Sequence, residues 1–142
     1  MKKISIIDGP NLNLTGIREP EIYGIQKIED YLTILHNRFK NTNIMYHQSN
    51  IEGELINFIH EAANTSDGIV LNAGGYCHTS VALHDAIKSI KIPIIEVHIS
   101  NIFAREEYRH HSLITSACRG MICGLGLDGY ALAIQSLLNQ TC

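Results

Sequence analysis

The sequence predicts an α/β fold in which helices cover both faces of one parallel, five-stranded sheet. Short apolar runs alternate with longer amphipathic stretches, an order typical of strands joined by helical crossovers. Hydrophobic residues make up 45% of the 142 residues, enough to build a core without disulfides or metals. We find no linker, repeat or low-complexity segment, and therefore expect a single domain over residues 1–142.

Five segments have the composition of buried strands, and four have the apolar periodicity of helices. The expected strands are 4–8, 44–48, 68–72, 92–98 and 121–124, and the expected helices lie near 25–40, 52–63, 80–89 and 129–138. Right-handed crossovers between such units favour a flavodoxin-like, doubly wound three-layer sandwich with strand order 2-1-3-4-5. In this topology ligands bind beyond the carboxyl ends of the strands, next to strands one and three.

The fourth strand ends in a row of polar residues. Glu96, His98 and Ser100 are spaced two apart and so share one face of the strand. Pro93, near the start of the segment 92–98, suits the first residue of a strand. Arg105 and Arg109 follow, one helical turn apart. This arrangement favours a catalytic site at the end of the strand. The simpler alternatives are that the polar side chains on the strand only hydrogen-bond to one another, and that the arginines belong to a solvated ion-pair face.

The connection 9–24 is long and rich in glycine, proline and polar residues. It carries Asn11, Arg18 and Tyr23, and we expect a hinged lid over about residues 11–24 without a strand or helix of its own. The alternative is that Arg18 and Tyr23 belong to the surface of a mobile loop.

A second polar loop, NAGGYCHTS, follows the third strand. Gly74 and its neighbour allow a ligand to approach main-chain N–H groups, and Thr79 or Ser80 is expected to cap the next helix. His78 would lie at the start of that helix, where an anion is favoured, although an isolated loop histidine is often a bystander.

Composition and motifs exclude several classes of function. A net charge of −3 without a basic stripe argues against nucleic acid and anionic membranes as partners. The cysteines lack CxxC spacing and no apolar signal segment is present, so we expect a reducing cytoplasm. No HExxH or Cys/His spacing predicts a metal, and GLGLDG at 124–129 lacks the strand and acidic residue that a dinucleotide site requires. We expect neither metal nor cofactor.

The three polar loops together resemble the type II 3-dehydroquinases, the 3-dehydroquinate dehydratases of the shikimate pathway. The resemblance covers nearly the whole chain, and its motifs are GPNLNL, REPEIYG, SNIEGELINFIH, IVLNAGGYCHTSVALHDAI, PIIEVHISNIFAREEYRHHS and ICGLGLDGYALAI. It implies a trans elimination of water from 3-dehydroquinate through an enolate, without a Schiff base, metal or cofactor. Departures include Thr15 in the lid and Cys77 in the second loop, neither of which has an assigned chemical role.

The resemblance also implies a role for each site residue. Tyr23 is the base with Arg18 beside it, His98 is the acid, Glu96 orients His98, and Asn11 holds a water that stabilises the oxyanion. A tyrosine is neutral near pH 7, so a nearby guanidinium is needed to favour the phenolate. The implied substrate contacts are Asn72, Gly74, His78, Asp85, Ile99, Ser100 and Arg109, with the carboxylate at Ile99 and Ser100. Asp85 would reach a neighbouring subunit, because similar enzymes form trimers that group into a dodecamer. The role of Arg105 stays open.

Two functions from other classes compete with this interpretation. A catalytically dead sensor of the same ligand is disfavoured by the intact set of Tyr23, Arg18 and His98. A flavin-binding electron carrier would need a hydroxyl-rich phosphate loop after the first strand, where this chain has Pro10 and Asn11. A type I enzyme would need an imine-forming lysine, but the lysines lie at the N-terminus or on predicted helix faces and connections.

Overall fold

A five-stranded parallel sheet forms the centre of the computed structural model, which describes residues 1–139. Its order is β2-β1-β3-β4-β5, as predicted. The strands are β1 (Lys2–Asp8), β2 (Thr42–Gln48), β3 (Gly68–Asn72), β4 (Ile94–His98) and β5 (Gly120–Cys123). The flavodoxin-like arrangement predicted from the sequence is therefore confirmed.

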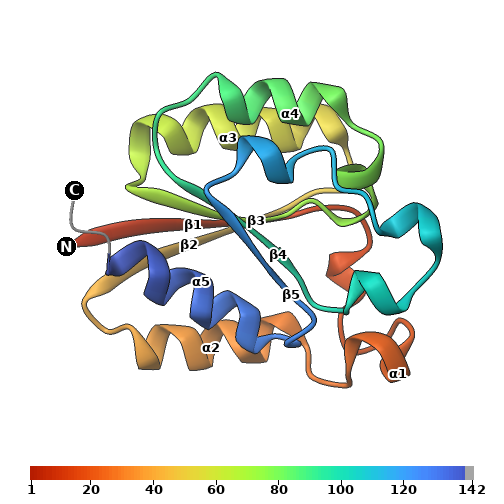
Figure 1. The fold of residues 1–142 in the computed structure, drawn as a ribbon. Helices are drawn as coiled ribbons and strands as arrows, with labels where there is room; N and C mark the ends of the chain where they lie inside the picture. Colours follow the sequence, from red (N-terminus) through yellow and green to blue (C-terminus); the bar gives the residue numbers. More distant parts are fainter. Residues whose placement is uncertain (140–142) are drawn as a thin grey trace.

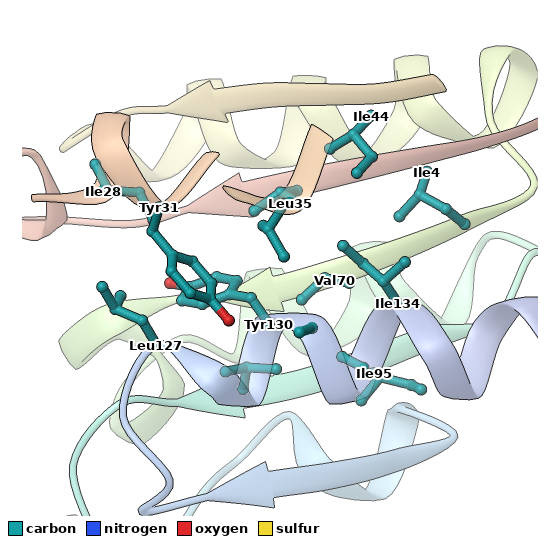
Figure 2. Packing of buried hydrophobic residues seen from close by; sticks show 14 of the residues in the cluster. Ile4, Ile28, Tyr31, Leu35, Ile44, Val70, Ile95, Leu127, Tyr130 and Ile134 are labelled. Carbon is teal, nitrogen blue, oxygen red and sulfur yellow. The ribbon is translucent and has the colours of Figure 1, made fainter. Parts of the chain in front are cut away.

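Two pairs of helices cover the sheet, one pair on each face (Figure 1). The helices are α1 (Pro20–Tyr23), α2 (Ile28–Arg38), α3 (Glu52–Thr65), α4 (Val81–Lys88) and α5 (Asp128–Leu138). Helices α2 and α5 pack on one face, where Figure 2 shows Leu35 and Ile134 directed toward the strands. Helices α3 and α4 bury Ile59 and Leu83 against the other face. Within the described part of the chain, no helix is long and apolar enough to cross a membrane.

Several predicted boundaries shift. Helix α2 begins at Ile28 and ends at Arg38, inside the expected 25–40, and β4 begins at Ile94 because Pro93, which has no N–H to donate, precedes the ladder. The expectation that the lid contains no helix was wrong. It holds a 3₁₀ turn, Leu12–Leu14, and the single-turn helix α1, whose first residue is Pro20. Proline suits a first helical position because its N–H would have no partner there.

The side chains of β4 alternate between the two faces of the sheet. Ile95 and Val97 join the core under α2 and α5, whereas Ile94 packs on the side of α3 and α4. Glu96 and His98 share the parity of Ile94, so they point to the α3 and α4 side. Both are buried, which means that the core itself holds them in place.

The loops that follow β1 and β3 lie in direct contact. The N–H of Gly9 donates to the carbonyl of Asn72 at 2.7 Å, and a Cβ on Gly9 would lie only 2.4 Å from the carbonyl oxygen of Ala73. Gly74 has φ 59°, a conformation that favours glycine, and a Cβ there would meet the carbonyl oxygen of Pro10 at 3.0 Å. Glycine at both positions lets the two loops approach backbone to backbone.

Candidate active site

A cavity of about 150 Å³ lies beyond the carboxyl ends of β1, β3 and β4. The position is the one predicted from the strand order. Every predicted site residue lines this cavity except Glu96, which lies buried behind His98, and Asp85, which lies on α4. Arg105, whose role the sequence left open, lines it as well.

His98 and Glu96 form a buried pair at the end of β4. Nε2 of His98 donates to Oε2 of Glu96 at 2.5 Å, and the His98 side chain is only 6% exposed. Because a carboxylate only accepts, this bond fixes a proton on Nε2 and the orientation of the ring. The two side chains lie on one face of β4, as their spacing predicted, and the bond between them limits rotation of the His98 ring.

Glu96 has further donors. Ser112 donates to Oε2 at 2.8 Å, and the hydroxyl of Thr115 donates to Oε1. Burial raises the pKa of Glu96, but the hydrogen bonds from His98, Thr115 and Ser112 outweigh it and hold the pKa below its ordinary value. The sequence analysis missed Ser112 and Thr115, because hydroxyls in an irregular segment give no local signal of what they bind.

Two guanidinium groups flank Tyr23. Nη1 of Arg105 donates to the hydroxyl oxygen of Tyr23 at 2.7 Å, and the Cζ atoms of Arg18 and Arg105 lie 4.9 and 5.3 Å from the centre of its ring. Arg18 also pairs with Glu19 at 3.4 Å. The sequence predicted Arg18 beside Tyr23, but the direct hydrogen bond comes from Arg105, which a pattern alone could not assign.

The first loop holds Asn11 in a left-handed conformation with φ 69°. Its N–H donates to Oδ1 of Asn50 at 3.0 Å, and Gln48 bonds both Asn50 and the carbonyl of Gly9. Asparagine tolerates this conformation better than most residues. The side chain of Asn11 is exposed and borders the cavity, where its amide is available to a ligand or a water. Farther along the lid, the hydroxyl of buried Thr15 donates to the carbonyl of Leu12. Thr15, which departs from the family pattern, therefore has a structural partner within the lid.

Asn72 ends β3 with both halves of its amide engaged. Oδ1 accepts from the N–H of Gly74 at 3.2 Å, and Nδ2 donates to the hydroxyl of Tyr130 at 3.0 Å. The side chain is almost fully buried, so these bonds determine which way the amide faces.

His78 lies at the end of a 3₁₀ turn, Gly74–His78, just before α4 and not at the first turn of that helix. Its Nδ1 donates to the carbonyl of His111 at 2.6 Å, and its ring stacks on that of His98 with centroids 6.4 Å apart. The proton on Nδ1 leaves Nε2 as the second polar atom of the ring. Ser80 caps α4 by accepting from the N–H of Leu83, one of the two alternatives predicted.

The arginines after β4 share an acidic partner. Arg109 donates from Nε to Oε2 of Glu106 at 2.8 Å, and Nε of Arg105 lies 3.8 Å from the same oxygen. Arg105 also donates to the hydroxyl of Ser100 at 3.3 Å. The ion-pair face and the ligand site are therefore not exclusive, because both guanidiniums also line the cavity.

Asp85 lies away from this cavity. Its side chain is 74% exposed on α4 and its one polar contact among the described residues is His84, at 3.4 Å. The chain by itself does not bring Asp85 to the site.

One group of possible metal ligands occurs among residues 1–139. The ligand atoms of Cys77, Glu96 and His98 lie within 4.8 Å of one another. The sequence analysis missed this group because its members are distant in the chain. Burial raises the pKa of the Cys77 thiol to about 12, which disfavours the thiolate that a metal needs, and His98 already donates to Glu96. The donor set therefore fits a proton-transfer pair better than a metal site.

Comparison with known proteins agrees with this geometry. Residues 2–138 match the family model described as dehydroquinase class II. A 3-dehydroquinate dehydratase of Nitrobacter winogradskyi is 52% identical over 96% of this chain and 89% of its own length, and one of Clostridium acetobutylicum is 52% identical over 97% of each chain. The crystal structure of a type II dehydroquinase from Butyrivibrio crossotus superposes with a TM-score of 0.94 at 46% identity, covering 97% of this chain and 98% of that one. The chain belongs to the class II dehydroquinase family.

Proposed function

We propose that this chain is a 3-dehydroquinate dehydratase that eliminates water from 3-dehydroquinate to give 3-dehydroshikimate, a step of the shikimate pathway. The observation that carries the proposal is one cavity with two proton-transfer groups from separate elements. Tyr23, bonded to Arg105, comes from the lid, and His98, bonded to Glu96, comes from β4. Removal of water from a β-hydroxy ketone needs a base at one carbon and an acid at the other.

Tyr23 acts as the base. Its oxygen already accepts a hydrogen bond from a guanidinium, and a second guanidinium lies against its ring. Two permanent cations therefore lie beside the oxygen and the ring of the proposed base. The phenolate takes the α-proton of the ketone, and the carbonyl becomes an enolate. Asn11 lines the cavity, and its amide would hold the water that stabilises the enolate oxygen.

His98 acts as the acid. Glu96 accepts from Nε2, so Nδ1 is the ring atom left to give a proton to the departing hydroxyl, which leaves as water. After turnover, Tyr23 holds the proton taken from the substrate and His98 has lost one, so the two must exchange protons with solvent before the next cycle.

Substrate binding uses neutral groups as well as cations. The N–H groups at Ile99 and Ser100 and the Ser100 hydroxyl would bind the carboxylate, and Asn72, His78 and Arg109 would bind the ring hydroxyls. Gly74 brings main-chain N–H groups close to the ligand. No imine or metal enters any step.

The proposal extends to the assembly and the compartment. Asp85, exposed on α4, would contribute to the site of a neighbouring subunit in a homododecamer built from four trimers. Residues 1–142 would form one catalytic domain with a lid at about 11–24. Cys77, Cys118 and Cys123 are free thiols, which suits a reducing cytoplasm.

A direct assay tests the activity. Purified protein is mixed with 3-dehydroquinate without added metal, and the ultraviolet absorbance of the conjugated enone product is followed. We expect a rise that survives both EDTA and borohydride, because neither a metal nor an imine takes part. No rise from protein shown to be folded would refute the proposed activity.

A further inference from the structure

A buried carboxylate outside the cavity is joined to it by a chain of hydrogen bonds. Asp8, the last residue of β1, is 1% exposed. Its Oδ1 accepts from the hydroxyl of Tyr130 at 2.7 Å and its Oδ2 from that of Tyr46 at 2.9 Å. Asp8 pairs in register with Asn72 of β3, and Tyr130 bonds to both. The mechanism above makes no use of this carboxylate.

The direction of each bond in the chain is determined. The N–H of Gly74 can only donate, so it fixes Oδ1 of Asn72 on its side and turns Nδ2 toward Tyr130. The Tyr130 oxygen accepts from Nδ2, and its own proton must go elsewhere. Asp8 Oδ1 receives it. A change at Asp8 therefore alters the partner that orients the Asn72 amide.

Apart from Tyr46, which bonds the other oxygen of Asp8, the described surroundings of Tyr130 are largely apolar. Tyr130 is fully buried on α5, among Leu127 and Tyr31 on the apolar face shown in Figure 2. Without Asp8 the phenolic proton of Tyr130 would have no acceptor there, and a buried polar group without a partner destabilises the arrangement that contains it. The turn from Asn72 to Gly74 is the part of that arrangement that borders the cavity.

We propose that Asp8 is a positioning residue, which acts through Tyr130 to hold the Asn72 amide and the Gly74 turn in the geometry that binds substrate. The inference rests on the proposed function for its kinetic consequence. It acts on binding and not on proton transfer, because Asn72 and Gly74 neither give nor take a proton in the reaction.

Four substitutions separate this role from a merely structural one. Asp8→Leu removes the acceptor, and Tyr130→Phe removes the bridge while keeping the ring. Asp8→Asn is the conservative variant: its Oδ1 can accept from Tyr130 while its Nδ2 donates to Tyr46. Tyr31→Phe is the matched control, because Tyr31 also donates a phenolic bond to a carboxylate in the same cluster, Asp128 at 3.0 Å, and among the described hydrogen bonds its hydroxyl has none to Asp8, Tyr130 or Asn72.

Steady-state kinetics and hydrogen–deuterium exchange give the two readouts. We expect Asp8→Leu and Tyr130→Phe to raise KM about tenfold, with kcat within about threefold, the scale expected for one lost buried hydrogen bond. Exchange in a peptide spanning residues 69–78 should quicken about tenfold in both variants. Asp8→Asn should keep the wild-type KM without quickened exchange, and Tyr31→Phe should behave as wild type in both measurements.

Each failure has its own meaning. Should Asp8→Leu fail to fold, Tyr130→Phe gives the same test with an unchanged ring. Wild-type KM and exchange in folded Tyr130→Phe, or equal damage from Tyr31→Phe, would overturn the positioning role. An inactive wild-type protein would refute the proposed function alone, because the exchange measurement needs no turnover.

Discussion

The hydroxyl oxygen of Tyr23 accepts a 2.7 Å hydrogen bond from Nη1 of Arg105, a residue 82 positions later in the chain. The bond joins the lid to the segment after β4 and crosses the cavity that both residues line. The guanidinium thus contacts the proposed base and ties the loop that carries it to the segment after β4. Substitution of Arg105 should therefore affect both the base and the lid.

Arg105→Met should lower kcat by about 10- to 100-fold, since it removes the charged hydrogen-bond donor to the oxygen of Tyr23. Steady-state kinetics of the variant and the wild type measure the loss. Arg105→Lys keeps the charge and should recover part of the loss. A kcat in Arg105→Met that matches wild type would refute this role.

Tyr23→Phe should reduce kcat by about 10²- to 10⁴-fold, the range for loss of a general base, while the fold persists because the ring remains. Circular dichroism and the binding of 3-dehydroquinate by calorimetry check the fold and the site. Near-normal turnover in this variant would contradict the assignment of the base.

His98→Asn should lower kcat on a similar scale, because an amide cannot protonate the departing hydroxyl. Initial rates over a range of substrate concentrations separate the two parameters. If KM alone rises, His98 is a binding group and the acid must be sought elsewhere in the cavity.

Glu96→Gln should make stability less dependent on pH in the acid range. The pKa of Glu96 is lower in the folded protein than in the unfolded chain, so its contribution is present above about pH 4.5 and is lost as pH falls through the folded value. Urea unfolding at pH 7 and below pH 4 should show a wild-type advantage that shrinks toward acid. An advantage of constant size would contradict the ionic role of Glu96.

For Asp8→Asn, the difference in stability from wild type should change with pH in the opposite direction and grow as the pH rises. Burial raises the pKa of Asp8 to about 7, although the hydrogen bonds from Tyr130 and Tyr46 act against it. Between about pH 4 and pH 7 the folded protein holds a proton that the unfolded chain has released, so wild-type stability falls with rising pH and levels off above 7. The variant should become more stable than wild type by up to about 4 kcal/mol at pH 8, and the difference should vanish near pH 4. Urea unfolding at pH 4, 6 and 8 measures it.

Local patterns predicted the fold, and the family resemblance supplied most of the residues that line the cavity. Alternating strands and helices with right-handed crossovers favoured the observed strand order, and a spacing of two residues placed Glu96 and His98 on one face of β4. The spacing of Arg105 and Arg109 left open an ion-pair face or a ligand site, and in the structure both guanidiniums lie near Glu106 and line the cavity.

What the sequence could not predict depends on contacts between distant segments. Thr115 and Ser112 approach Glu96 from an irregular stretch, and Tyr130 reaches Asp8 across 122 positions. The one available sign of this network was that Asp8 ends the apolar strand 4–8. A carboxylate buried there needs hydrogen-bond partners, but the sequence does not say which residues they are. The helix α1 was missed because a single turn has no periodicity to detect.

The backbone contact at Gly9 limits how this enzyme can be remodelled. Since a Cβ at Gly9 would collide with Ala73, the segments around Pro10 and Gly74 must be exchanged together when loops are grafted between relatives. Residues 15–24 contain no such contact with the β3 loop in the described hydrogen bonds. Loop libraries that seek new substrates should therefore keep Arg18 and Tyr23, vary the other residues of 15–24, and treat the two glycine-bearing turns as one inherited unit.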